Sequence, residues 1–150
     1  DFIEFVPILE SYGLKMLLNE AVKVNKNGAE IWLAGIDDAH LYDCHNIAKA
    51  LAPIPQNTSS ILLSHTPEIY TEAADAGVDY VLCGHTHGGQ ICLPGGYPLI
   101  LHLRHGRKYY RGVWQYKEMT GFTSQGCGTI GIPIRFNTVS EATLITLLKG

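Results

Sequence analysis

Three histidines stand where two short apolar segments end, and their spacing suits metal binding. His85 and His87 lie two residues apart in the glycine-rich stretch LCGHTHGGQICLPGG, and His65 closes the apolar segment SSILLSH. Side chains two residues apart point the same way from an extended segment. Imidazoles at two neighbouring strand ends can converge closely, which suits Zn²⁺, Mn²⁺ or Fe better than Ca²⁺ or Mg²⁺. The pattern therefore predicts a metal site at His65, His85 and His87.

The alternative is that His85 and His87 only occupy a glycine-rich turn. Gly88 and Gly89 favour such a turn, because glycine lets the backbone bend sharply or approach another group closely. His65, in the equivalent place after the neighbouring strand, favours the metal interpretation. Two common metal motifs do not fit the residues after the pair. A metallo-β-lactamase HxHxDH motif needs Asp and His where Gly89 and Gln90 stand, and a cupin needs Glu near Ile91.

The elements around these histidines form an alternating pattern of strands and helices. Residues 14–36 read as extended segments with a hairpin turn at Asn27-Gly28, and the apolar runs 59–65 and 78–85 read as buried strands. Helices are predicted over 42–53, stopped by Pro53, and over 66–77, with proline in the first turn. His65 and His85 then stand at the carboxyl ends of strands, where α/β sheets gather ligands. Antiparallel strands are predicted within 107–126 and at 141–149.

Composition describes one ordinary folded domain. The chain has 150 residues, of which 46% are hydrophobic and 17% charged, with a net charge of −3. The acidic balance argues against general nucleic-acid binding. No apolar run approaches the roughly 18 residues that a membrane span needs. Four cysteines without a CxxC pair read as free, mostly buried thiols.

Other motifs favour structural roles. GCGTIG at 126–131 matches GxGxxG, but Pro133 prevents the helix that a dinucleotide site requires, so a turn between strands is expected. The basic segment 104–112 is interpreted as a solvated loop, with contact to an anionic substrate as the alternative. The run 37–40, DDAH, could supply ligands, although capping of the following helix is the favoured interpretation. No partners are evident for the remaining histidines, which are His45, His102 and His105.

The combination of motifs resembles the calcineurin-like metallophosphoesterases. Their last motif is GHxH and the preceding one is a lone histidine after a strand, matched here by GHTH at 84–87 and SHTP at 64–67. The longer form GHTHGGQ, with GCGT at 126–129 and PIRF at 133–136, is similar to a bacterial branch of the family.

The resemblance implies an α/β fold, a two-sheet β-sandwich flanked by helices, of which this chain supplies one sheet and part of the other. It also implies two divalent metal ions (Mn, Zn or Fe), with His65 and His85 on one ion and His87 on the other. A metal-bridged water would then hydrolyse a phosphomonoester or phosphodiester.

The family's first three motifs, DxH, GDxxD and GNH[DE], are not complete here. The opening residues 1–13 resemble the segment after GNH in such proteins, with Asp1 as the last letter of that motif. We therefore expect residues 1–150 to be the C-terminal portion of a single metallophosphoesterase domain. The bridging aspartate, the catalytic histidine and any anchor or signal are expected upstream of Asp1.

The same resemblance sets the expected partners. They are a small-molecule phosphoester or phospholipid-like substrate and the upstream half of the same protein, with self-association where that half is missing and no nucleic acid. Alone, the chain is expected to be inactive. The competing hypothesis is a non-enzymatic metal-binding or interaction module.

Overall fold

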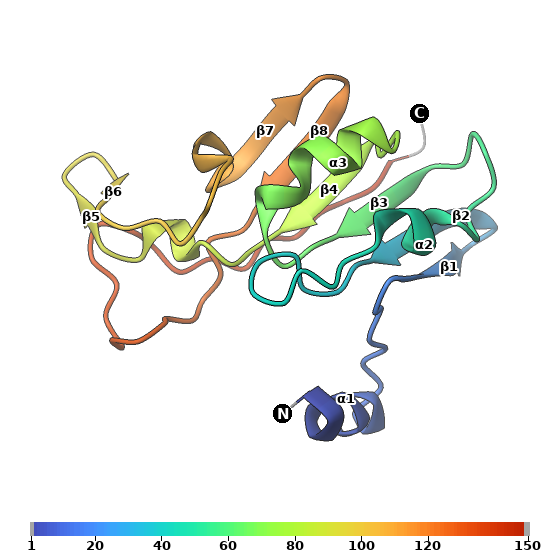
Figure 1. Cartoon of the computed structure of the whole chain (residues 1–150), viewed down its shortest axis with the longest axis horizontal. Coiled ribbons are helices and arrows are strands. Elements are labelled where there is room, and N and C mark those ends of the chain that lie inside the picture. The colour runs from blue at the N-terminus through green and yellow to red at the C-terminus, as the bar shows by residue number, and fades with distance from the viewer. Residues whose placement is uncertain (1, 149–150) are drawn as a thin grey trace.

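The chain folds around a six-stranded mixed sheet with helices on one face (Figure 1). The structure, a computed structural model, describes residues 2–148. The strands of the large sheet are, in spatial order, β1 (Glu20–Lys26), β2 (Ala29–Gly35), β3 (Ser60–Leu63), β4 (Tyr80–Cys83), β8 (Met119–Thr123) and β7 (Gly112–Tyr116). A small second sheet pairs β5 (Cys92–Leu93) with β6 (Tyr97–Pro98). The helices are α1 (Phe2–Ser11), α2 (Ile47–Leu51) and α3 (Tyr70–Asp75). The predicted α/β class is confirmed.

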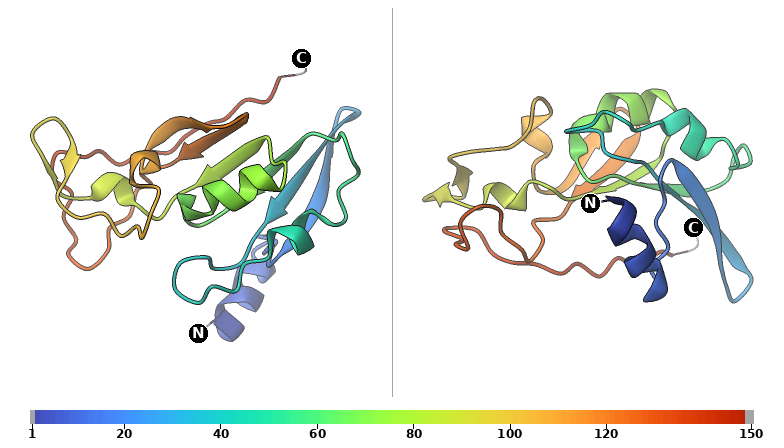
Figure 2. Two further views of the ribbon diagram at one scale, coloured as in Figure 1. Left: turned by 45° about the horizontal axis from the view of Figure 1, so that its top comes forward. Right: turned by 60° about the horizontal axis from the view of Figure 1, so that its bottom comes forward.

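The four central strands of the large sheet run in the same direction. β2, β3, β4 and β8 are parallel, and the antiparallel strands β1 and β7 close the two edges. α2 lies on the connection from β2 to β3, and α3 on that from β3 to β4. Both helices lie on one face of the sheet, while α1 and the C-terminal segment lie towards the other (Figure 2). The carboxyl ends of all four parallel strands therefore meet at one edge of the sheet.

The core fills the space between this sheet and the helices α2 and α3. Leu62 and Val81, from the central strands, are fully buried against Ile69 and Ala73 of the α3 region. The first three residues of β3 are buried, which fits a central strand of a sheet that carries helices. At the β7–β8 end the core is completed by aromatic packing, with the rings of Tyr109 and Trp114 4.6 Å apart.

Most of the expected elements are present. The β1–β2 hairpin turns at Asn27 and Gly28, which both have positive φ as a type I′ turn requires. The helix predicted over 66–77 starts as a 3₁₀ turn at Pro67–Ile69, continues as α3 and ends before Gly77, whose φ is +78°. None of the helices within residues 2–148 combines the length and the apolar character that a membrane span requires.

Two expectations about secondary structure are wrong in part or in full. The helix predicted over 42–53 is only the five residues of α2, because Asn46 caps it by accepting from the Lys49 N–H at 2.8 Å. The segment predicted as a strand at 141–149 has no regular structure over 141–148, and Lys149 lies outside the described residues. A strand needs a neighbouring backbone, and here Leu144 and Leu148 project into solvent instead.

The cysteines are free thiols, as predicted, but only half of them are buried. Cys83 and Cys92 are buried, whereas Cys44 and Cys127 are exposed. Burial raises the pKa of the Cys83 thiol far above its ordinary value, so this residue stays protonated two positions before His85. A protonated thiol is a poor metal ligand, and Cys83 acts as a core residue.

Gly121 on β8 gives a test of the core. It faces Trp114 across the β7–β8 pair, and a Cβ added there would overlap the buried indole. Because Trp114 is also held by its Nε1–H bond to Thr123 Oγ1 at 2.8 Å, the ring cannot move freely. We expect Gly121→Ala to lower the free energy of unfolding by about 1–3 kcal/mol, measured by urea denaturation. Gly84→Ala, where an added Cβ meets only an ordinary contact at 3.9 Å, is the control. Equal stability of the two variants would contradict this packing.

Candidate metal centre

His65 and His85 occupy matching positions on neighbouring strands. Each follows the last residue of its strand by two positions, after Leu63 in β3 and after Cys83 in β4. The parallel pairing continues beyond the strands, since Ser64 N–H donates to Leu82 O at 3.0 Å and Gly84 N–H to His65 O at 3.1 Å. The sheet therefore delivers both imidazoles to the same place at its carboxyl edge.

The two imidazoles converge on each other. His65 Nε2 lies 3.1 Å from His85 Nδ1, and the ring centroids are 4.8 Å apart. The other ring nitrogen of His85, Nε2, donates to the backbone carbonyl of His102 at 2.7 Å. A carbonyl can only accept, so the proton of neutral His85 sits on Nε2 and the Nδ1 lone pair points towards His65.

This arrangement fits a divalent metal ion bound through nitrogen. Two imidazole nitrogens each about 2.1 Å from one ion are roughly 3.0–3.4 Å apart at ordinary coordination angles. The backbone carbonyl behind His85 is the kind of outer partner that fixes the tautomer of a metal-binding histidine. Burial lowers the pKa of both His65 and His85, which favours the neutral form that can bind metal.

His87 lies on the same loop but is not the third member of this pair. Its Nδ1 donates to Gly128 O at 3.1 Å, which leaves the Nε2 lone pair free to bind a ligand. Within residues 2–148, no group of three or more His, Cys, Asp or Glu side chains is close enough together to hold a metal ion. The described chain thus offers two converging imidazoles and one separate imidazole.

The loop that carries His85 and His87 has an uncommon backbone. His85 and His87 have φ values of +70° and +50°, and Gly88, Gly89 and Gln90 follow at +62°, +87° and +51°. Positive φ is rare for residues with a side chain, and such strain concentrates at functional sites. The glycines are also needed for space, because a Cβ on Gly88 would overlap the Gln125 side chain. The backbone therefore turns sharply at these glycines.

Glu68 holds His40 and the segment that carries His102 next to His85. No sequence pattern identified this residue. Its side chain is buried, and one oxygen lies 2.7 Å from His40 Nδ1, while the other accepts from the Arg104 N–H. Burial alone raises the pKa of Glu68, but these hydrogen bonds outweigh burial and hold the pKa below its ordinary value. The carboxylate therefore fixes both His40, whose ring lies 4.5 Å from that of His85, and the segment that carries His102.

The run at 37–40 does not cap a helix, which corrects the favoured interpretation. Asp38 Oδ2 accepts from the N–H groups of Leu41 and Tyr42, both at 2.6 Å, in a turn that precedes α2. His40 reaches the neighbourhood of His85 but is engaged by Glu68. This turn follows β2, so it lies at the same edge of the sheet as the histidines.

The histidines without an evident partner all take part in contacts. His45 Nε2 lies 3.0 Å from Glu72, and His105 Nε2 donates to the Glu68 carbonyl at 2.8 Å. His102 contributes its backbone carbonyl to His85. In the basic segment 104–112, Lys108 and Arg111 lie over the rings of neighbouring tyrosines, which favours the structural interpretation of that segment.

Comparison with known proteins finds clear relatives. The chain is 31% identical over 144 residues to the uncharacterized metallophosphoesterase YkoQ and 34% identical over 121 residues to the uncharacterized metallophosphoesterase YkuE, both from Bacillus subtilis. These alignments cover 95% and 81% of this chain, and 53% and 42% of the relatives. The chain is also 28% identical over 141 residues to phosphodiesterase YaeI of Escherichia coli, covering 93% of this chain and 50% of that protein.

The chain belongs to the calcineurin-like metallophosphoesterase family. It spans about half the length of the curated relatives that it matches. No family model matches it, and no solved structure matches it at a significant level. The resemblance to the bacterial branch that includes YkuE and YaeI is confirmed by these relatives.

In this metallophosphoesterase chain, Arg135 of the PIRF motif ties the glycine-rich segment to His87. Its guanidinium donates to the carbonyls of Gln125, Gly126 and Gly128 at distances from 2.6 to 3.1 Å, and to the His87 carbonyl at 3.1 Å. Gly128 O thus accepts from both Arg135 and the His87 ring. The GCGT motif is a loop that Arg135 holds against the candidate ligand.

The histidine pair gives a test of metal binding. In the complete gene product, His65→Ala and His85→Ala should each sharply reduce bound metal, measured by elemental analysis after loading with Mn²⁺ or Zn²⁺. Because both residues would serve one ion, the double variant should lose little more than either single variant. Unchanged metal content in both single variants would rule out this pair as ligands.

Arg135 gives a separate test at the His87 position. Arg135→Ala and Arg135→Lys should weaken metal binding there about 10- to 100-fold, as loss of an outer partner of a metal-binding histidine does. Lysine fails because its single ammonium cannot reproduce the planar fork that spans several carbonyls. The measurement is metal titration by calorimetry, in which binding at the His65–His85 pair should stay the same. Arg107→Ala, which removes an exposed arginine, is the control, and equal affinities in all four proteins would contradict this role for Arg135.

Proposed function

We propose that this protein is a metal-dependent phosphoesterase, and that His65, His85 and His87 are its ligands to a binuclear centre of two divalent cations. The observation that carries the proposal is the convergence of His65 Nε2 and His85 Nδ1 to 3.1 Å at two adjacent strand ends. Membership of the metallophosphoesterase family supports the reaction class. His65 and His85 would hold one ion and His87 the other.

The chain's own residues prepare these ligands in three ways. Burial lowers the pKa of His65 and His85, which favours their neutral forms, and the carbonyls of His102 and Gly128 fix the tautomers of His85 and His87. The loop 85–90 has positive φ at every residue except Thr86 and places His87 Nδ1 against Gly128 O, which leaves Nε2 for a separate ligand. When bound, divalent cations supply Lewis-acid stabilisation of phosphoryl oxygens and activate a water molecule.

The proposal includes residues from outside this chain. Two ions with three or four protein ligands each need about six to eight ligands, and this chain offers only three imidazoles. A carboxylate shared between the two ions is also needed to hold them close together. We propose that an upstream portion of the same domain supplies this carboxylate and the histidine that protonates the leaving oxygen. Residues 1–150 would then be the C-terminal portion of that domain.

The test compares the isolated 150-residue chain with the complete gene product. Both are stripped with EDTA, reloaded with Mn²⁺, Zn²⁺ or Fe²⁺, and assayed on p-nitrophenyl phosphate and bis-p-nitrophenyl phosphate. We expect hydrolysis by the complete protein only, with losses of about 100-fold or more in His85→Ala and His87→Ala. His45→Ala, which removes a histidine bound to Glu72, is the matched control and should retain activity.

Two outcomes would contradict the proposal. Metal binding without hydrolysis of either ester by the complete protein would favour the non-enzymatic metal-binding module. Robust hydrolysis by the isolated chain would show that the catalytic groups lie within residues 1–150 and that no upstream portion is needed.

A further inference from the structure

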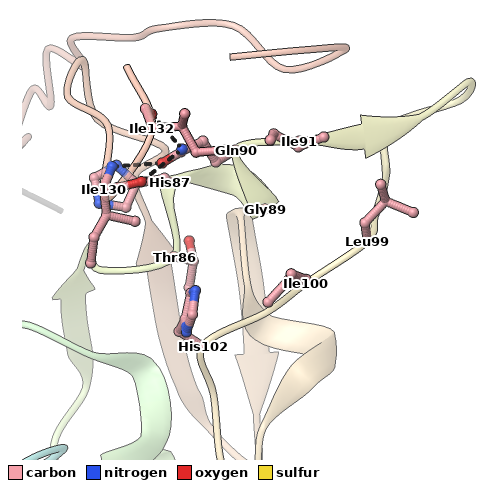
Figure 3. A pocket seen from close by; sticks show the side chains of 10 residues that line it. All are labelled: Thr86, His87, Gly89, Gln90, Ile91, Leu99, Ile100, His102, Ile130 and Ile132. Carbon is pink, nitrogen blue, oxygen red and sulfur yellow. Dashed lines mark hydrogen bonds between the residues drawn. The ribbon is translucent and has the colours of Figure 1, made fainter. Parts of the chain in front are cut away.

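An apolar cavity of about 190 Å³ opens beside His87 (Figure 3). Its walls come from three separate parts of the chain: the loop 86–91, the segment 99–102 and the segment 130–132. Leu99 and Ile100 lie across the cavity from Ile130 and Ile132 (Figure 3). The proposed metal ligand His87 is therefore also part of the wall of an aliphatic cavity.

The cavity is built by Gln90, the last residue of the GHTHGGQ motif. Gln90 Nε2 donates to the carbonyls of Ile130 and Ile132 at 3.0 and 3.1 Å, and its Oε1 accepts from the Ile130 N–H at 2.7 Å. One buried side chain thus fixes the far wall to the loop that carries His87.

Apart from the imidazoles of His87 and His102, the polar side chains of the lining are already hydrogen-bonded within the protein. The Gln90 amide is bonded to the far wall, and the Thr86 hydroxyl donates to Tyr110 O at 2.6 Å and accepts from the Gly88 N–H at 3.3 Å. No Asp, Glu, Lys or Arg among the described residues lines the cavity. A sugar or a nucleobase placed here would lose hydrogen bonds to water and gain few in return. The lining instead suits a hydrocarbon group.

We propose that this cavity is a substrate subsite, and that it takes an aliphatic ester group of the phosphoester whose phosphate lies at His65, His85 and His87. This inference rests on the proposed function. Cavities of about 150 Å³ lined by aliphatic side chains hold a molecule of about six carbons, so this cavity has room for a chain of similar size. His87 would contact the phosphate and also lines the cavity. The ester group attached to that phosphate would therefore lie at the cavity mouth.

The test measures how the rate depends on chain length. The complete, metal-loaded protein is given methyl, butyl and hexyl phosphoesters, as monoesters or diesters according to the class that it cleaves. Each buried methylene contributes about a threefold to fourfold gain in binding. We therefore expect kcat/KM to rise at least about tenfold from methyl to butyl, and to level off once the cavity is full.

Variants of the cavity wall test whether the dependence of kcat/KM on chain length arises in this cavity. Ile100→Ser and Ile132→Ser should reduce the butyl-to-methyl ratio of kcat/KM to about threefold or less, because each replaces an aliphatic wall by a hydroxyl. Both residues are more than half exposed, so neither variant removes a core side chain. Ile100→Leu should keep the ratio, as should Val113→Ser, which removes an exposed aliphatic side chain from β7.

The outcomes separate this inference from the proposed function. Hydrolysis of every ester with no dependence on chain length, or an unchanged ratio in both serine variants, would overturn the subsite while the phosphoesterase function stands. Such a result would indicate that another part of the protein covers the cavity. Failure to cleave any ester, including the methyl ester, with any of the metals would overturn the proposed function and this inference together.

Discussion

The parallel pairing of β3 with β4 is the constraint on which the candidate site depends. Its register, Leu62 opposite Val81 and Leu63 opposite Leu82, determines where each strand ends relative to the other. A shift of one residue would turn every side chain of one strand to the opposite face. His65 and His85 would then point away from each other. The buried apolar residues of β3 and β4 thus determine the geometry of two polar side chains that lie outside the core.

Polar contacts made by Glu68 and Arg135 support this geometry. Glu68 sits in the first turn after β3 and reaches both the turn after β2 and the segment that carries His102. Arg135 does the equivalent on the other side of the site, where it gathers the carbonyls of the loop after β8. The buried carboxylate of Glu68 is satisfied by imidazole and backbone partners, which is the condition under which a buried charge is stable, whereas Arg135 is only partly buried. Glu68 and Arg135 therefore fix the loops on the two sides of the candidate site.

Sequence patterns predicted the parts of the structure that depend on local chemistry. The β1–β2 hairpin follows from Asn27-Gly28, and the strands β3 and β4 from short apolar runs. The proximity of His65 and His85 followed from their equal distances beyond those strands. Contacts between distant segments could not be found in this way. Glu68, Gln90 and Arg135 act on residues up to 48 positions away, and no local pattern marks them as partners. The strand predicted at 141–149 failed for the same reason, because β propensity does not provide a neighbouring backbone.

The order of the strands also has a consequence for folding kinetics. β3, α3 and β4 form one continuous unit, so the His65–His85 contact closes a loop of only 20 residues. The contact between His87 and Gly128 spans 41 residues and requires that β8 has docked against β4 after the long excursion through β5, β6 and β7. Because closing a longer loop costs more chain entropy, we expect the two parts of the candidate centre to form at different stages of folding. The histidine pair can exist in a partly folded chain, whereas the position of His87 is defined only when the last strand of the sheet is in place.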